Sequence, residues 1–384
     1  MRLAAVTTVR NECDIIESFV RHNAAFFDRL YILDHRSTDK TSAILRNLAE
    51  EGLPLALSSD DSGVFYQGPT MTRLIRGAHH DHPWDFVMPL DCDEFVCMPD
   101  RAALEATLAQ LDGATIGLVD LASYVPTTTD DAKQIDVPRR IVHRAKTIPE
   151  IPRKIGKVVI PRAVIGQGGF ALGEGHHGVS IDRKPVPERR LDGVTLAHFP
   201  IRSIDQFIMR AILCRLAWAS RKDYDSGWGW HYETFIEHLK KRPIISDADL
   251  TAAALLYVDI YTEPGRMLYQ KALVREPLTL AYDRLRFTEF IDVAVLPPIL
   301  DMMDVVLDEL REARAGDRQL QAENDRLRAE GERLRAEILA MKDSTSWRLT
   351  APLRAGVLGL AALRALAGRD SAAISQEKKA DPSS

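Results

Sequence analysis

The 384-residue sequence lacks features that define several special classes of protein. It has only 4 cysteines and no CxxC pair, so the sequence indicates neither a disulfide scaffold nor a cysteine-rich metal module. It has no basic excess, because 50 Lys and Arg stand against 55 Asp and Glu, which argues against a nucleic-acid binder. No uncharged apolar stretch reaches the ~20 residues of a membrane-spanning helix. The first twelve residues become charged too early for a signal peptide, so we expect a cytoplasmic protein, soluble or peripheral at the inner face of the membrane.

The composition that is present is that of an ordinary globular protein. Hydrophobic residues make up 46% of the chain and charged residues 27%, which excludes collagen-like and intrinsically disordered classes. The length fits one large α/β domain with an appendage, or two domains.

Short apolar runs alternate with helix-like segments through the first hundred residues. The runs predict strands at residues 3–9, 30–33, 54–57 and 86–90, and the helical spacing predicts helices at 15–27, 41–50 and 70–80. This alternation predicts βαβ units and an α/β fold with a doubly wound, mostly parallel sheet. We expect residues 11–14 to form a turn and cap before the first helix, and Thr38 or Asp39 to cap the second.

Beyond residue 100 the pattern loosens. We expect helices at 102–111, 204–220, 232–240 and 247–260, and strands at 115–121, 157–161 and 194–199. A loop with some extended structure covers 123–155, and a glycine-rich stretch covers 166–178.

The C-terminal region carries a heptad pattern from Met303 to Met341. Asn324 falls at an a position, where a buried amide favours a parallel, in-register pair of helices, whereas Asp317 and Gly331 weaken the seam. The pattern predicts a coiled coil and a homodimer; a single solvated helix is the alternative. Residues 343–369 read as a basic amphipathic segment that lies on anionic lipid or packs on another protein, and 370–384 as a disordered tail.

The sharpest chemical signal is the Asp91-Cys92-Asp93-Glu94 run directly after the fourth predicted strand. Carboxylates are costly to gather unless a cation neutralises them. An Asp-x-Asp at the carboxyl end of a strand sends two side chains to one side, ready to hold a hard cation such as Mg²⁺ or Mn²⁺. This end of an open α/β sheet is also where ligands bind. A solvated acidic loop is the alternative for an isolated motif of this kind.

Four segments in order resemble the inverting nucleotide-sugar glycosyltransferases of family 2, which have the GT-A fold. They are residues 9–12 (VRNE), 33–41 (LDHRSTDKT), 84–95 (WDFVMPLDCDEF) and 196–203 (LAHFPIRS) with Gln206 and Phe207. The third resembles the DxDEF version of one bacterial subgroup. Phe199 stands where that subgroup usually has Tyr. The resemblance covers about residues 1–215.

The resemblance implies a divalent metal, Mn²⁺ or Mg²⁺, held by Asp91, Asp93 and His198. Asp93 is expected as the direct ligand, Asp91 on the ribose or a metal-bound water, and Glu94 as a buttress. A divalent ion neutralises the nucleotide diphosphate as it leaves. For His198, a hydrogen-bonded core histidine is the alternative.

The donor nucleotide is expected at the edge formed by the first two predicted strands. The residues expected there are Arg10, Asn11, Glu12, Asp34 and Ser37, together with Arg73 and Asp91. Turn and cap chemistry is the alternative for Asp34 and Ser37 and is compatible with donor binding. Surface ion pairs are the alternative for Arg73 and Arg76.

An inverting transfer needs a general base that takes the proton of the acceptor hydroxyl. Glu174 in the glycine-rich stretch is the first candidate by its order along the chain, with His176 or His177 as rivals and Asp223 or Asp225 as a third choice. A flexible loop without catalysis is the alternative. Aromatic residues then offer an acceptor platform or simple core packing: Trp218, Trp228, Trp230 and Tyr232.

The sequence therefore predicts a metal-dependent inverting glycosyltransferase. Its donor is a nucleotide-diphosphate sugar, expected to be UDP-linked, and its acceptor a glycan, lipid or other molecule in surface polysaccharide synthesis. The expected domains are a GT-A-type doubly wound unit at 1–215, divided near residue 100 into donor and acceptor halves, a helical extension at 216–300 and a coiled coil at 301–342. A nucleotidyltransferase and a catalytically degenerate sugar-binding scaffold are the alternatives.

Overall fold

The computed structural model describes residues 1–61, 66–147, 156–219, 230–241, 246–260, 269–291 and 297–343. Asp223, Asp225, Trp228, the basic segment beyond residue 343 and the C-terminal tail lie outside these ranges. Residues 1–307 form one compact unit, and residues 308–384 are assigned to a second.

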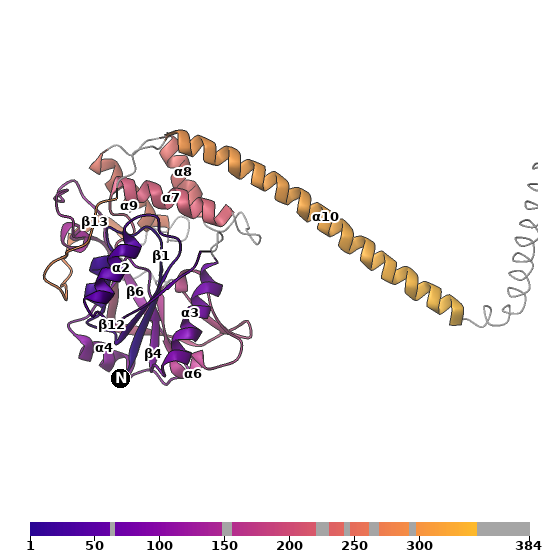
Figure 1. The fold of residues 1–384 in the computed structure, drawn as a ribbon, viewed down its shortest axis with the longest axis horizontal. Coiled ribbons are helices and arrows are strands. Elements are labelled where there is room, and N and C mark those ends of the chain that lie inside the picture. Colours follow the sequence, from indigo (N-terminus) through magenta and orange to yellow (C-terminus); the bar gives the residue numbers. More distant parts are fainter. Residues whose placement is uncertain are drawn as a thin grey trace, which may run out of the picture. The chain divides into compact units, whose positions relative to one another are not determined.

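An eight-stranded sheet in the order β3-β2-β1-β4-β8-β6-β12-β5 forms the centre of the first unit (Figure 1). Its strands are β1 (Leu3–Val9), β2 (Arg29–Asp34), β3 (Leu55–Ser59), β4 (Phe86–Pro89), β5 (Glu94–Cys97), β6 (Ile116–Ser123), β8 (Lys157–Pro161) and β12 (Glu188–His198). Pairing is parallel except where β8 joins β4 and β6 and where β5 joins β12. The predicted mostly parallel sheet is therefore confirmed, with two strands reversed.

Both faces of the sheet are buried, as a doubly wound fold requires. Along β1, Leu3, Ala5 and Val9 join one apolar cluster with the helices α1 (Ile16–Asn23), α2 (Thr41–Glu50) and α4 (Arg101–Leu108). Ala4 and Val6 point to the other face and pack with α3 (Gln67–Asp81) and α6 (Arg162–Ile165). Figure 1 shows α2 and α4 on one side of the sheet and α3 on the other.

A third apolar cluster lies under the helices α7 (Ile204–Ala219), α8 (Trp230–Lys241) and α9 (Asp247–Ile260). Met303 and Leu307, near the start of α10 (Pro297–Asp343), are buried in the same cluster. The predicted helices at 204–220, 232–240 and 247–260 therefore form a layer of the first unit.

Several short elements were not predicted. They are β5, α6, α5 (Val137–Arg140), β7 (His143–Thr147), β9 (Phe170–Leu172), the 3₁₀ helix η1 (Glu174–His176), β10 (Val179–Ile181), β11 (Lys184–Pro185) and β13 (Tyr269–Arg275). β9, β10 and β11 form a three-stranded antiparallel sheet within the glycine-rich stretch, and β13 pairs with β7.

The segment at 269–291 differs from the predicted helical extension at 216–300. After β13 it is irregular, and its amides at Arg286, Phe287 and Thr288 donate to the Glu17 carboxylate at 2.8, 2.7 and 2.9 Å. Phe287 also packs on the apolar cluster of α1 and α2. We call residues 276–291 the strap. The strap ties this part of the chain to the N-terminal half, and residue 215 is not a boundary of the compact unit, which continues to Leu307.

Neither helix has the predicted cap. The N-cap residue of α2 is Lys40, without a side-chain cap, although Asp39 Oδ1 accepts a hydrogen bond from the Thr41 amide at 2.9 Å. The turn before α1 is present, but its N-cap residue is Ile15, without a side-chain cap. Asp14 does not cap the helix because its carboxylate is bound by Arg202.

The heptad pattern lies on one continuous helix, α10. The structure contains a single chain, so the coiled coil stays a prediction. Across the described ranges, no helix is both long and apolar enough to cross a bilayer.

Candidate functional site

The predicted acidic motif lies at the edge of the sheet where several strands end. Asp91 and Asp93 follow β4, Glu12 follows β1, and His198 is the last residue of β12. Lys157 opens β8, which runs antiparallel beside β4, so its first residue reaches the same edge. Ligands bind at this edge in open α/β sheets.

Asp91 is held by a buried lysine. Lys157 Nζ lies 2.5 Å from Asp91 Oδ2 and 3.0 Å from Glu94 Oε1, and the lysine side chain is only 3% exposed. Glu94 Oε2 accepts a hydrogen bond from the Asp91 amide at 3.0 Å. Glu94 therefore braces Asp91 through both its backbone and the shared lysine.

Asp93 is held by arginines. Arg210 Nη1 lies 2.5 Å from Asp93 Oδ2, and Arg202 Nη1 lies 3.7 Å from the same oxygen. Arg202 is fully buried and forms a two-pronged contact with Asp14, at 2.7 and 2.9 Å, and a further ion pair with Glu12. The turn after β1 is thus joined to the acidic motif through a single guanidinium.

The second oxygen of each aspartate faces an imidazole. Asp91 Oδ1 lies 3.6 Å from His176 Nδ1, and Asp93 Oδ1 lies 3.6 Å from His198 Nε2. Burial, with a further contribution from Lys157, lowers the pKa of His176 to about 3. Burial also lowers the pKa of His198 to about 4, although Asp93 opposes this. Both rings are therefore neutral near pH 7, the form that binds metals.

The ion-paired cluster carries more negative than positive groups. Among the described residues that form ion pairs at this edge, five carboxylates (Glu12, Asp14, Asp91, Asp93 and Glu94) face three cations (Lys157, Arg202 and Arg210), which leaves two negative charges if all are ionised. Burial raises the pKa of Glu12 to about 7 and that of Glu94 to about 8, although Arg202 and Lys157 oppose these shifts. A bound proton or a bound cation can supply the missing positive charge.

The donor atoms suit a divalent ion. Asp93 Oδ1 and both ring nitrogens of His176 are buried without a hydrogen-bond partner in the described part of the chain. Carboxylate oxygen and neutral imidazole together suit Mn²⁺, and carboxylate oxygen suits Mg²⁺. No group of three His, Cys, Asp or Glu residues in the described ranges is close enough to be a ready-made metal centre. The arrangement is instead two Asp–His pairs, with His176 beside Asp91 and His198 beside Asp93.

The predicted donor-binding residues lie on two loops that are joined to each other. Asn11 has a φ of 56°. Its side-chain Oδ1 accepts a hydrogen bond from the Thr38 backbone amide at 2.7 Å, and its backbone amide donates to Ser37 Oγ at 3.0 Å. Asp34 Oδ1 accepts from the Ser37 amide at 3.0 Å, so the turn chemistry considered for Asp34 and Ser37 is present. Arg10 Nε is buried and has no hydrogen-bond partner among the described residues.

Arg73 and Arg76 make contacts outside the acidic cluster. Arg73 is 69% exposed and lies 3.4 Å from Asp60, as the surface ion-pair alternative predicts. Arg76 donates to the Phe170 carbonyl at 2.9 Å and so anchors β9 to α3.

The two base candidates lie in different surroundings. Glu174 lies beside the start of α3, where a Cβ on Gly68 would be 3.7 Å from Glu174 Oε1. His176 is fully buried beside Asp91 and has a φ of 62°, a strained conformation for a residue other than glycine. Such strain persists only where surrounding contacts enforce it, often at functional sites. The rival His177 instead contacts the Gly156 carbonyl through Nδ1 at 3.0 Å.

Of the predicted aromatic platform, only Trp218 has a described side chain, and it is half-buried on α7.

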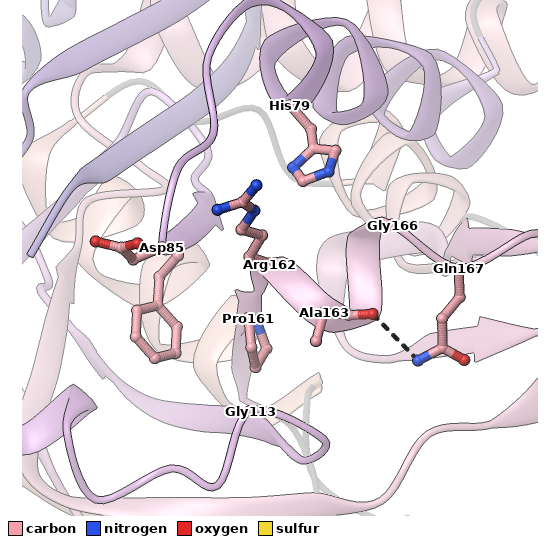
Figure 2. A pocket seen from close by; sticks show the side chains of 9 residues that line it. His79, Asp85, Gly113, Pro161, Arg162, Ala163, Gly166 and Gln167 are labelled. Atoms are coloured by element: carbon pink, nitrogen blue, oxygen red, sulfur yellow. Dashed lines mark hydrogen bonds between the residues drawn. The ribbon is translucent and has the colours of Figure 1, made fainter.

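A separate cavity of about 520 Å³ lies where β4 begins and β8 ends (Figure 2). His79, Asp85, Arg162 and Gln167 are among its lining residues. None of the predicted site residues lines it, because β4 places the acidic motif at its opposite end.

Sequence reasoning missed four charged residues of the cluster: Asp14, Lys157, Arg202 and Arg210. Lys157 had a local signal, since it opens an apolar strand (KVVIP) in which a lysine needs a buried partner. Arg210 had none, because its partner lies 117 residues away in the sequence.

No family model matches the chain, and no curated protein matches it. Solved structures similar to it include S. aureus TarS 1–349, at 14% identity and a TM-score of 0.34 over 63% of this chain and 73% of that one. The chain spans 44% of a longer TarS structure. A Pyrobaculum calidifontis mannosyltransferase in complex with GDP-Man and Mn²⁺ is 14% identical over 68% and 81% of the two chains, with a TM-score of 0.32.

A third similar structure is glucosyl-3-phosphoglycerate synthase from Mycobacterium tuberculosis in complex with Mn²⁺, uridine-diphosphate and phosphoglyceric acid. It is 18% identical over 56% of this chain and 77% of that one, with a TM-score of 0.31.

Proposed function

We propose that the protein is a metal-dependent inverting glycosyltransferase that uses a nucleotide-diphosphate sugar, expected to be a UDP-sugar. Its acceptor would be a glycan, a lipid-linked molecule or another component of surface polysaccharide synthesis. The proposal joins the four sequence motifs to the cluster of charged groups at one edge of the sheet.

The observation that carries the proposal is the pair of aspartates after β4, each with one oxygen on a cation and the other 3.6 Å from a neutral, buried imidazole. A purely structural ion-pair network would be expected to balance its charges and satisfy its buried donors and acceptors. This cluster has two negative charges in excess if all its groups are ionised. His176 also keeps two buried nitrogens without hydrogen bonds within the described residues.

Asp93 and His198 would hold the divalent ion, with Asp91 as a further ligand or as the residue that orients a ligand. The ion would supply positive charge at the leaving diphosphate. Lys157 fixes the rotamer of Asp91, and Arg210 fixes that of Asp93, so the carboxylates need little reorganisation. Arg10, with its buried Nε, and the linked loops of Asn11 and Ser37 would line the nucleotide.

Glu174 and His176 are the proposed candidates for the general base. Burial lowers the pKa of His176 to about 3, so the ring is neutral but weakly basic near pH 7, and its nearness to Asp91 is what would stabilise the imidazolium that forms. Glu174 is the first residue of the same 3₁₀ helix, near α3. Substituting each with Gln separates them, because loss of the base lowers transfer to the acceptor more than it weakens donor binding.

Hydrolysis of a panel of UDP- and GDP-sugars by the full chain, with and without Mn²⁺, tests the function. We expect metal-dependent release of the nucleoside diphosphate, which Asp93→Asn abolishes and Asp192→Asn, an exposed change on β12, leaves intact. A nucleotidyltransferase would instead release pyrophosphate from a nucleoside triphosphate and a sugar phosphate. A degenerate scaffold would release neither product.

The turn after β1 argues against the nucleotidyltransferase. Those enzymes have a glycine-rich, basic loop at this place, whereas residues 10–14 here contain no glycine and use Asp14 to hold Arg202.

A further inference from the structure

The apolar stripe of α10 changes from buried to exposed along the helix. Met303 and Leu307 are buried under α7–α9. Farther along, Leu320 is 72% exposed and Leu327 59%, and Leu334, Ile338 and Met341 are also exposed. These five exposed residues, from Leu320 to Met341, all fall at a or d positions of the heptad, so they form one stripe, which we call the α10 seam. Exposed apolar side chains in a row on one helix face indicate a protein surface that covers them.

The charges beside the α10 seam are sorted by sign. With Asn324 at a and Leu327 at d, every charged g residue is acidic and every charged e residue is basic. The described charged g residues are Glu323, Glu330 and Glu337, and the described charged e residues are Arg314, Arg328 and Arg335, while Gly316 at g and Gln321 at e are uncharged. In the sequence, Glu309 at g and Lys342 at e continue the same order.

This order of charges favours a second copy of α10 as the partner and a parallel arrangement of the two helices. In a parallel, in-register pair, each g residue faces the e residue five positions later on the other helix. Glu323 then faces Arg328 of the second copy, and Glu330 faces Arg335 of the second copy, each twice by symmetry. In an antiparallel pair, g faces g and e faces e, so Glu would meet Glu and Arg would meet Arg.

We propose that α10 binds a second copy of this chain as a parallel, in-register, two-stranded coiled coil along the α10 seam. Asn324 supports two strands and one register, because two buried amides pair only when they are level. Asp317 and Gly331 at a positions make the seam weaker, so the charge pairs contribute a larger share of its specificity.

The oligomeric state of the full chain, measured by light scattering after size-exclusion chromatography, tests the proposal. We expect a dimer, and we expect Glu323→Arg with Glu330→Arg to raise its dissociation constant at least about 100-fold, since four attractive contacts become repulsive. A control with Asp325→Arg and Glu332→Arg, both at b positions away from the seam, should stay dimeric. A chain with Arg328→Glu and Arg335→Glu should also dissociate, and mixing the two dissociated variants should restore a dimer.

Disulfide formation between two chains tests whether the two α10 helices are parallel and in register. Leu327→Cys at d should cross-link two full chains under mild oxidation, because only equivalent residues of a parallel pair come within the ~7 Å limit for a disulfide. Arg326→Cys at c should not cross-link. A monomeric full chain, a trimer or larger oligomer, a charge-reversed variant that stays fully dimeric, or a Leu327→Cys chain that fails to cross-link would overturn the proposal.

Discussion

Lys157→Met removes the cation on which the acidic motif depends. The lysine side chain is 3% exposed, and its ammonium lies 2.5 Å from Asp91 and 3.0 Å from Glu94. Burial lowers the pKa of Lys157, but the two carboxylates raise it by more, so the lysine is charged in the folded state. Methionine keeps most of the aliphatic volume and removes the ammonium that both carboxylates share.

Breaking a buried ion pair by removing one partner costs about 3–5 kcal/mol of unfolding free energy. We expect a loss of this size for Lys157→Met at pH 7, against about 0.5 kcal/mol or less for the exposed control Lys184→Met. The carboxylates determine how this loss of unfolding free energy changes with pH. The folded-state pKa of Glu94 is already about 8 in the unmodified chain, and removing the lysine raises it further and raises that of Asp91, so the loss is complete above these folded-state pKa values and shrinks as the pH falls below them.

Urea denaturation of both variants and the unmodified chain, at pH 7 and pH 5, measures this difference. A Lys157→Met chain as stable as Lys184→Met at pH 7 would refute the reasoning, because the carboxylates would then not need the lysine.

Two further predictions concern stability. Glu17→Ala should lower the unfolding free energy by about 3–5 kcal/mol and speed amide hydrogen exchange at residues 286–288. The Glu17 carboxylate is fully buried and accepts hydrogen bonds from three backbone amides of the strap and from Arg21 Nε. Unchanged exchange at residues 286–288 would contradict this prediction. Burial lowers the pKa of His22, whose Nδ1 accepts from the Ala281 amide. Stability from neutral His22 is therefore complete above the unfolded pKa of ~6.5 and declines below it. His22→Gln should show a shallower loss between pH 7 and 5 in urea denaturation, and an equal loss would count against this explanation.

The main sheet could be predicted because its strands carry their signal locally. Residues 3–9 are apolar on both faces and bounded by polar turns, so their burial between two helical layers follows from the run itself. The end of the first helix could not be predicted in this way. The pattern continued to residue 27, but the helix ends at Asn23, whose side-chain amide pairs with the Glu94 carbonyl and the Val96 amide of β5.

β5 itself and the short strands of the glycine-rich stretch depend on partners far along the chain. Glu94–Cys97 is four residues long and pairs with the end of β12, about 100 residues later, so the motif that suggested an acidic loop hid a strand. Long-range pairing of short segments overrides local preference.

In the candidate site, too, some residues have a local sequence signal and others depend on contacts far along the chain. Asp91, Asp93 and His198 could be proposed from their positions after apolar strands, and the structure places them at one edge. The cations could not be paired with the motif from the sequence. The local signal of Lys157 indicates a buried partner but not which one, because Asp91 lies 66 residues away, and Arg210 meets Asp93 across 117 residues without any local signal.

We propose that the aspartates after β4 hold a divalent ion at a nucleotide diphosphate, and isothermal titration of UDP into the full chain with Mn²⁺ measures this. We expect binding that requires Mn²⁺ and weakens by at least about 10–100-fold in Asp93→Asn, while Asp192→Asn binds like the unmodified chain. Equal affinity for UDP in Asp93→Asn and the unmodified chain, or no binding with Mn²⁺ present, would contradict it.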